Sequence, residues 1–283
     1  MPIVELRNLY FSYEGSAKPA LKNINLVIDR GEFIVLTGPS GCGKSTLCRV
    51  LNGLIPHFYR GRLSGQALVA GLDVKETPTY ILARHVGMVF QNPENQLFLS
   101  TVERELAFGL ENLGLPEEDI ERRVKQALDY FGLTDLRDRP PYLLSGGQQQ
   151  KVAIAAVMIM EPELLILDEP TANLDPVSAE EILELLEKLR KEKDISVLLV
   201  EHRLELVLRY ATRLLIMREG EIIADGPPER VILTEHANIV GIPPVVEVYK
   251  ILSDTRYALK NIPLTPSDLA SEIEAVVKRE VGH

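Results

Sequence analysis

Alternation of apolar and polar positions, interrupted by fully apolar runs, dominates the first part of the chain. Residues 4–13 and 21–29 alternate, which is typical of half-buried β-strands, and residues 63–72 add a further strand element. Residues 33–37 form a short apolar run that predicts a buried strand. Residues 164–167 are wholly apolar, as expected for a strand buried on both faces of a parallel sheet. The chain therefore combines the signals of antiparallel and of parallel strands.

Helical periodicity alternates with these strands. Residues 101–160 follow a mostly helical pattern, and residues 178–191 predict a charged helix. Residues 196–200 predict another strand, and residues 214–217 and 221–224 predict a hairpin. Strands and helices in this order predict an α/β protein.

The last part of the chain departs from this pattern. Proline and glycine interrupt it at residues 226–228 and 243–244, and residues 245–252 predict a short amphipathic helix. The sequence Thr-Pro-Ser-Asp at residues 265–268 is a strong helix start, with threonine as the cap. Its helix has one apolar face, which must pack either on the same domain or on another subunit. The residues of that face are Leu269, Ile273, Val276 and Val277.

A phosphate-binding motif follows the strand at residues 33–37. The sequence Gly-Pro-Ser-Gly-Cys-Gly-Lys-Ser-Thr fits the pattern G-x-x-x-x-G-K-[ST], and a helix is predicted to start at Thr46. The loop N–H groups and the positive helix end face phosphates in such motifs. Lys44 should reach the β- and γ-phosphates, and Ser45 should bind Mg²⁺. The candidate nucleotide-binding residues are Gly38, Ser40, Gly41, Cys42, Gly43, Lys44, Ser45 and Thr46.

Two adjacent carboxylates follow the apolar run 164–167. Asp168 would emerge at the carboxyl end of its strand, where ligands of open α/β sheets bind, and it can join the metal site. Glu169 can polarise a water for attack on the γ-phosphate. A solvated acidic turn is the alternative, but a neighbouring phosphate loop favours the catalytic interpretation.

In the order of its motifs, the chain resembles the nucleotide-binding subunits of ATP-binding cassette (ABC) transporters over about its first 225 residues. Residues 144–148, Leu-Ser-Gly-Gly-Gln, match the family signature. The resemblance implies that Tyr13 stacks on adenine and that Gln91 senses Mg²⁺ and the membrane partner. It also implies that His202 is the switch histidine at the γ-phosphate. Glu201 stands where the family usually has threonine.

The resemblance further implies that two subunits pack head to tail. Ser145, Gly146, Gly147 and Gln148 of one subunit would then close over the ATP of the other, with a helix starting near Gln148. Asp175 would lie in the loop that faces the other subunit, although Asp before Pro is a good helix start in any case. The chain carries one phosphate loop and one signature, so a second copy or a relative must complete two sites.

Composition limits the partners of the chain. Its 283 residues, 46% of them hydrophobic, suffice for an α/β domain with an appendage, and the net charge of −10 argues against nucleic acid. Cys42 and Cys48 suggest no disulfide framework, so we expect a reducing compartment. Cys42 lies beside a predicted helix N-terminus, which would favour its thiolate and its alkylation. No signal peptide is visible, and the longest apolar run, nine residues, is too short to span a bilayer. We therefore expect peripheral attachment to separate membrane proteins at the cytoplasmic face.

One stretch of the chain resembles a particular branch of the ABC transporter family. Residues 92–98, with residues 101–103 and 107–112, look like the ATPases of energy-coupling factor importers, which take up vitamins or transition-metal ions such as cobalt and nickel. The resemblance implies that Glu94 meets basic residues of a transmembrane partner. The alternatives are a solvated turn for Glu94 and, for the whole chain, a soluble ABC ATPase that uses ATP-driven dimerisation outside transport.

These observations together imply a phosphate-loop ATPase that requires ATP and Mg²⁺. We expect a mainly parallel sheet, an antiparallel β portion, an inserted helical subdomain and a C-terminal helical appendage. The expected domains are an ABC ATPase domain at residues 1–225, with its helical subdomain at about residues 92–160, and a mostly helical extension at residues 226–283.

Overall fold

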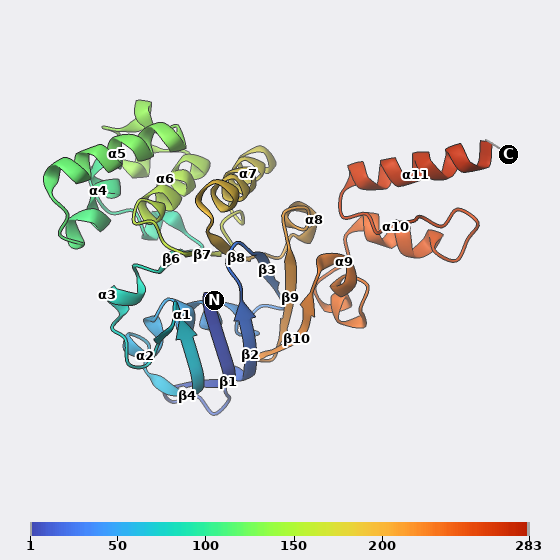
Figure 1. Cartoon of the computed structure of the whole chain (residues 1–283), viewed down its shortest axis with the longest axis horizontal. Helices are drawn as coiled ribbons and strands as arrows, with labels where there is room; N and C mark the ends of the chain where they lie inside the picture. The colour runs from blue at the N-terminus through green and yellow to red at the C-terminus, as the bar shows by residue number, and fades with distance from the viewer. Residues whose placement is uncertain (1, 282–283) are drawn as a thin grey trace.

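Residues 2–281, which the computed structural model describes, form two β-sheets and a layer of helices (Figure 1). In this part of the chain the larger sheet has six strands in the order β10-β9-β3-β8-β7-β6, and all neighbouring pairs are parallel except β10 with β9. The prediction of a mainly parallel sheet is therefore confirmed. Its strands are β3 (Phe33–Thr37), β6 (Val86–Val89), β7 (Leu164–Asp168), β8 (Ser196–Val200), β9 (Arg213–Arg218) and β10 (Glu221–Gly226).

Alternate side chains of the central strands face two different cores. In β3, Phe33 and Val35 pack into the core beneath the helical layer, whereas Ile34 and Leu36 pack into a second core on the opposite face. All four side chains are completely buried. Burial on both faces explains why these strands are apolar throughout, because every position in the strand lies against another layer.

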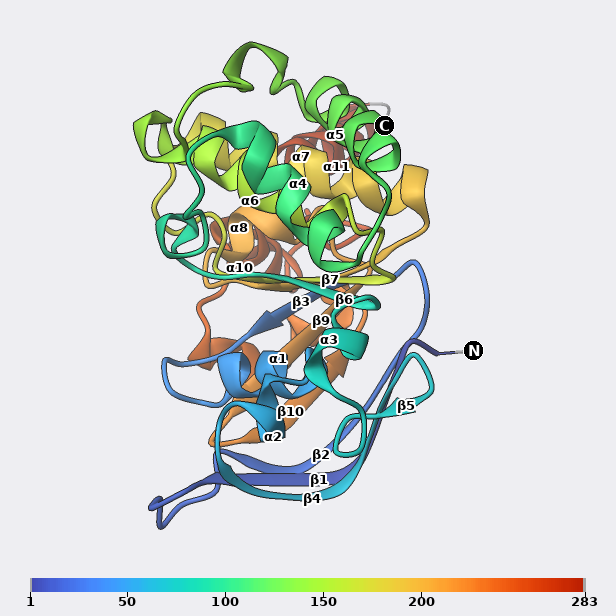
Figure 2. The same ribbon diagram turned by 90° about the vertical axis from the view of Figure 1, so that its left-hand side faces the viewer.

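The antiparallel β portion is a separate sheet, with the order β2-β1-β4-β5 within the described residues. The predicted strand at residues 63–72 is interrupted, because Ala70 and Gly71 have φ angles of +50° and +77° and turn the chain. Figure 2 shows the parallel sheet between this sheet and the helical layer. The strands are β1 (Val4–Tyr13), β2 (Leu21–Ile28), β4 (Gly61–Val69) and β5 (Leu72–Asp73).

Short helices fill the space between the two sheets. Leu47, Val50 and Leu51 of the first helix are completely buried in the second core together with residues of β1. This packing fixes the phosphate loop, which enters that helix, against both sheets. The helices of this layer are α1 (Lys44–Leu51), α2 (Leu54–His57) and α3 (Thr79–Leu82).

The helical layer on the other face confirms the helical pattern predicted for residues 101–160. Apolar residues of its helices join those of β3 and β8 in one core. The elements are η1 (Pro93–Asn95), α4 (Val102–Asn112), α5 (Glu117–Phe131), η2 (Thr134–Leu136), η3 (Pro141–Leu143), α6 (Gly146–Met158) and α7 (Pro176–Lys193).

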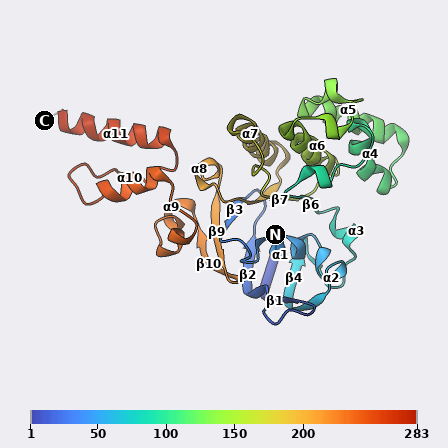
Figure 3. The ribbon, with the colours of Figure 1, turned by 180° about the vertical axis from the view of Figure 1, so that it is seen from behind.

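The C-terminal segment forms an arm beside the sheet (Figures 1 and 3). The predicted cap at Thr265 is confirmed, since its Oγ1 accepts a hydrogen bond from Asp268 N at 3.1 Å. Val246 and Leu264 are buried in the main core, whereas Ile273 and Val277 are exposed. The extension therefore packs partly on its own domain and leaves some apolar surface free. Its elements, with the short helix before β9, are α8 (Leu204–Val207), α9 (Pro228–Val231), η4 (Glu235–Ile239), α10 (Pro244–Leu252) and α11 (Pro266–Val281).

Within residues 2–281, none of the helices combines the length and the apolar character that crossing a membrane requires.

Candidate functional site

The phosphate loop connects the carboxyl end of β3 with the start of α1. The helix begins at Lys44, two residues earlier than predicted, and Gly43 precedes it with a φ of +113°. A Cβ on Gly43 would lie 2.6 Å from the carbonyl oxygen of Ala20, and one on Gly38 would lie 2.2 Å from that of Met217. Both positions therefore exclude a side chain for reasons of space as well as of backbone conformation.

Lys44 is almost completely buried within the loop that it belongs to. Its Nζ donates hydrogen bonds to the carbonyl oxygens of Gly38 at 2.7 Å and Pro39 at 3.2 Å. A buried ammonium group needs such partners, because an unpaired charge away from water is strongly unfavourable. The loop thus holds the positive charge beside its own N–H groups, where a phosphate can bind.

Of the three residues predicted to bind the metal, Ser45 and Asp168 lie together, whereas Gln91 donates a hydrogen bond to Glu169. Asp168 is the last residue of β7, and its carboxylate accepts a hydrogen bond from the Ser45 side chain at the start of α1. Burial raises the pKa of Asp168, although the hydrogen bond from Ser45 acts in the opposite direction. A hydroxyl and a carboxylate oxygen suit Mg²⁺, which usually takes one or two protein carboxylates and completes its shell with phosphates and water. The residues present therefore fit a Mg²⁺ ion bound together with a nucleotide.

Glu169 brings the three predicted catalytic residues together. Its Oε2 accepts a hydrogen bond from Gln91 Nε2 at 2.9 Å, and its Oε1 lies 3.1 Å from His202 Nε2. The backbone of Glu169 is left-handed, with a φ of +51°, and its N–H donates to the carbonyl oxygen of Val200 at 3.0 Å. Residues from three neighbouring strands thus meet at one carboxylate next to the metal ligands.

Tyr13 reaches the phosphate-loop helix from β1. Its hydroxyl lies 3.1 Å from Thr46 Oγ1 and accepts a hydrogen bond from Arg49 at 3.3 Å. The ring packs edge-on against Phe11, with centroids 4.8 Å apart. A cavity of about 560 Å³ lies beside Tyr13, lined in part by Arg60. This volume accommodates a purine base, so the stacking role of Tyr13 stays a prediction that the local shape permits.

The signature residues begin α6, and the helix starts at Gly146 rather than near Gln148 as predicted. Ser145 caps it: its Oγ accepts from Gln148 N at 3.4 Å, and Gln148 Oε1 accepts from Ser145 N at 3.0 Å. A Cβ on Gly147 would lie 3.1 Å from Ser178 of α7. Ser145, Gly147 and Gln148 therefore have structural tasks within their own subunit, and Ser145 and Gly146 are also exposed.

Asp175 caps α7, as its position before proline predicts. Its Oδ1 accepts hydrogen bonds from the N–H groups of Val177 and Ser178, both at 3.0 Å. The Ser178 hydroxyl also donates a hydrogen bond to Asp175 Oδ2, at 2.6 Å. This hydrogen bond, together with those from the two N–H groups, lowers the pKa of Asp175. Nearby, Asn173 Nδ2 donates to Asn92 Oδ1 at 3.2 Å and joins this loop to the segment after Gln91.

Glu94 is exposed in the 3-10 helix η1, and Gln96, two residues later, lines an apolar groove of about 340 Å³. Tyr80 and Phe98, which line the groove, are 71% and 65% exposed, unusually high values for aromatic side chains. The buried Glu105 fixes one wall, since its Oε2 accepts from the N–H groups of Phe98 at 3.1 Å and Leu99 at 2.7 Å.

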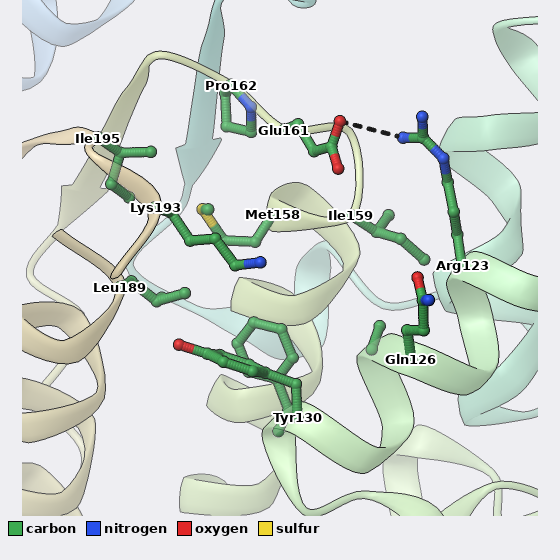
Figure 4. A pocket seen from close by; sticks show the side chains of 12 residues that line it. Arg123, Gln126, Tyr130, Met158, Ile159, Glu161, Pro162, Leu189, Lys193 and Ile195 are labelled. Atoms are coloured by element: carbon green, nitrogen blue, oxygen red, sulfur yellow. Dashed lines mark ion pairs between the residues drawn. The ribbon is translucent and has the colours of Figure 1, made fainter. Parts of the chain in front are cut away.

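A second cavity, of about 460 Å³, lies between α5 and α7 (Figure 4). Arg123, in its wall, pairs with Glu161 at 3.4 Å, and the hydroxyl of Tyr130 donates to Glu192 at 2.7 Å. The ammonium of Lys193 lies 5.4 Å from the centroid of the Tyr130 ring. None of the predicted site residues lines this cavity.

The expectation for Cys42 is corrected by its surroundings. The thiol is only 5% exposed, and burial raises its pKa despite the nearby charge of Lys44. Desolvation disfavours the charged thiolate more than the helix end and the lysine favour it. Cys42 is therefore a buried, protonated thiol and not an activated one.

A phosphate loop on a mainly parallel sheet, with a signature helix in a helical layer, defines a nucleotide-binding protein of the ABC class. A family model of ABC transporters matches residues 21–172, and the chain belongs to this family. ATP is the nucleotide that the family binds, and Mg²⁺ is its usual companion.

The relatives carry only provisional names as ABC transporter ATP-binding proteins. One from Pyrococcus abyssi is 46% identical over 231 residues, which cover 82% of this chain and 82% of the relative. One from Methanosarcina mazei is 45% identical over 254 residues, which cover 88% of this chain but 43% of the relative. The chain thus spans less than half the length of the first curated relatives that it matches.

Two solved structures are similar. CbiO1 from Clostridium perfringens, part of the ABC transporter complex CbiONQ, superimposes with a TM-score of 0.75 at 36% identity, covering 89% of this chain and 94% of CbiO1. The ATP-binding cassette MJ0796, solved as a dimer in a post-hydrolysis state with ADP and phosphate, gives 0.69 at 30% identity. That match covers 80% of this chain and 98% of MJ0796.

Proposed function

We propose that this chain hydrolyses ATP and thereby powers a transporter whose membrane-spanning parts are separate proteins. The observation that carries the proposal is the Glu169 carboxylate, held by Gln91 at 2.9 Å and by His202 at 3.1 Å beside the Ser45–Asp168 pair. Such a carboxylate can accept a proton from the water that attacks the γ-phosphate. Gln91 and His202 orient it, and Lys44 binds the phosphates. Mg²⁺, when bound by Ser45 and Asp168, neutralises charge on the phosphate oxygens.

The test is the ATPase activity of Glu169→Gln, which keeps the size of the side chain and removes its charge. We expect kcat to fall by about 10²-fold or more while ATP binding survives, since general-base catalysis contributes about 10²–10⁴-fold. Glu161→Gln is a matched control, because Glu161 shares the left-handed backbone, with a φ of +57°, but is exposed and lies at the Arg123 ion pair, away from the site. Near wild-type turnover of Glu169→Gln would remove Glu169 from catalysis.

The active unit of this proposal is a pair of ATPase subunits, either two copies of this chain or this chain with a relative. Ser145 and Gly146 are exposed at the start of α6, where a partner subunit can present ATP to them. The dimeric MJ0796 structure supports this arrangement. Asp175, at the exposed start of α7, is the proposed residue of the loop that meets the partner.

The transporter proposed is an energy-coupling factor importer of a vitamin or a transition-metal ion. Two observations support it: the sequence at residues 92–98, and the similarity to CbiO1, which is part of the CbiONQ complex. The groove that begins at Gln96, two residues after Glu94, exposes Tyr80 and Phe98, as expected of a surface that receives an apolar helix of a partner. In this proposal the chain attaches peripherally to the cytoplasmic face of the membrane through that groove, and nucleic acid is not a partner.

Charge reversal at Glu94 separates docking from catalysis. We expect Glu94→Lys to hydrolyse ATP like the wild type but to copurify poorly with membrane proteins, because like charges would meet at the contact. Glu229→Lys is the matched control, since Glu229 is exposed on α9, away from the groove. Normal assembly and transport by Glu94→Lys would exclude Glu94 from the contact. A wild-type protein that never associates with membrane proteins would favour the soluble ABC ATPase instead.

A further inference from the structure

Glu201 is a carboxylate with almost no access to water, although it lies next to the catalytic His202. It is 2% exposed, and it occupies the position where the family usually has threonine. Thr171 Oγ1 donates a hydrogen bond to Glu201 Oε1, and the backbone N–H of His202 donates to Oε2 at 3.2 Å. Arg203 Nε donates to Oε1 at 3.4 Å. A buried carboxylate is tolerated only when it is paired and hydrogen-bonded in this way.

Arg203 holds the same threonine from the other side. Its Nη2 donates to the backbone carbonyl oxygen of Thr171 at 2.5 Å and to Thr171 Oγ1 at 2.9 Å. The Thr171 side chain, which is completely buried, therefore accepts from Arg203 and donates to Glu201. Its hydroxyl satisfies both roles at once, which valine at this position could not do.

Thr171 lies in the loop between Glu169, the proposed catalytic carboxylate, and Asp175, which is proposed to meet the partner subunit. It follows Glu169 by two residues, and its carbonyl oxygen also accepts from Leu174 N at 3.1 Å, directly before Asp175. The buried group formed by Thr171, Glu201 and Arg203 thus ties residues 169–175 to residues 201–203.

The hydrogen bonds among Thr171, Glu201 and Arg203 connect the two segments that carry Glu169 and His202, the proposed catalytic pair. The side chains of Glu169 and His202 meet through a hydrogen bond of 3.1 Å, and they are 22% and 40% exposed. That side-chain hydrogen bond lies at a wet surface and adds only about 0.5–1.5 kcal/mol to the backbone hydrogen bond from Glu169 N to Val200 O that joins the same two segments. The buried group fixes the separation of the same two loops away from water.

We infer that Thr171, Glu201 and Arg203 form a clamp, buried at Thr171 and Glu201, that positions His202 against Glu169 for ATP hydrolysis. Thr171 and Glu201 are buried and act only through the residues that they hold, and the 35% exposed Arg203 joins them by its hydrogen bonds, so all three are positioning residues. By holding residues 169–175, it also transmits the state of the switch histidine to Asp175 at the start of α7. The inference rests on the proposed ATPase function and adds to it a residue set that the family resemblance does not supply.

The experiment compares Thr171→Val with Thr171→Ser in the full chain. Valine keeps the shape and removes the hydroxyl, whereas serine keeps the hydroxyl. For Thr171→Val we expect kcat to fall by about tenfold to a hundredfold with the KM for ATP unchanged, because misplacement by about 1 Å costs that much. Thr171→Ser should stay within about twofold of the wild type, as a rescue by the conservative variant.

Thr212→Val serves as a control for loss of a hydroxyl that is hydrogen-bonded at both its donor and its acceptor, although Thr212 itself is exposed. Thr212 Oγ1 accepts from Phe33 N at 2.9 Å and donates to Phe33 O at 3.1 Å, at the opposite end of the sheet from the site. We expect its kcat to equal that of the wild type. An equal loss of kcat in Thr212→Val and Thr171→Val would show a general packing effect and overturn the clamp.

Amide hydrogen exchange tests the clamp without using turnover. In the nucleotide-free protein, Thr171→Val should speed exchange in both segments, residues 169–175 and residues 201–204, and Thr171→Ser should not. Unchanged exchange in both segments would refute the clamp, as would full kcat in Thr171→Val. A wild-type protein without ATPase activity that still shows the paired exchange effect would instead refute the proposed function and leave the clamp in place.

Discussion

The adenine site offers a prediction whose size can be worked out from Tyr13. The ring lies beside a cavity of about 560 Å³, and its hydroxyl contacts Thr46 and Arg49 of the phosphate-loop helix. Stacking of a base on an aromatic ring is worth about 1–3 kcal/mol by alanine substitution. Because about 1.4 kcal/mol is tenfold in affinity, Tyr13→Ala should weaken ATP binding by about 5- to 150-fold.

Two comparisons separate stacking from support of the loop. Tyr13→Phe keeps the ring and loses only the contacts with Thr46 and Arg49, so we expect its affinity for ATP to change by less than about threefold. Inorganic tripolyphosphate has no base, so Tyr13→Ala should bind it as the wild type does. Isothermal titration calorimetry with both ligands measures these affinities. Equal losses for ATP and tripolyphosphate in Tyr13→Ala would show that Tyr13 supports the phosphate loop and does not stack on adenine.

Two further predictions follow from buried titratable groups. Burial raises the pKa of Asp168, so its contribution to stability is present below its ordinary pKa and is lost as pH rises through the raised value. At neutral pH, with a chelator present, Asp168→Asn should therefore resist unfolding by urea better than the wild type. This difference should vanish in acid, and Mg²⁺-ATP should stabilise only the wild type. A difference in stability that does not depend on pH would contradict the prediction. Burial also raises the pKa of Cys42, which is 5% exposed. Iodoacetamide should therefore label Cys42 at least about tenfold more slowly in the folded protein than in the urea-unfolded protein, as measured by mass spectrometry. Comparable labelling rates would contradict the burial of Cys42.

The strands and most helices could be predicted because local pattern and tertiary burial agree. The run at residues 164–167 is apolar at every position, and β7 is indeed covered on both faces. Asp168 and Glu169 could be placed at the carboxyl end of that strand for the same reason. Where a motif has a strict local geometry, as at residues 38–46, the sequence predicts the strand, loop and helix in the right order and the helix start to within two residues.

Contacts between distant segments could not be predicted. Thr171 and Glu201 are thirty positions apart, and no local pattern indicates that they meet. The sequence marked Glu201 only as a departure from threonine, and neither Thr171 nor Arg203 stood out. The prediction of a reactive thiolate at Cys42 was wrong for a related reason. The effect of burial on the pKa of Cys42 depends on neighbouring residues that its position beside a helix end does not reveal.

A structure of the Glu169→Gln protein with Mg²⁺ and ATP is the most direct test of a two-subunit ATPase. We predict a dimer in which ATP lies between the phosphate loop of one copy and Ser145 of the other. Its γ-phosphate should contact Lys44, with Mg²⁺ on Ser45 and near Asp168. A monomer, or a nucleotide whose phosphates lie away from residues 38–46, would contradict the proposal.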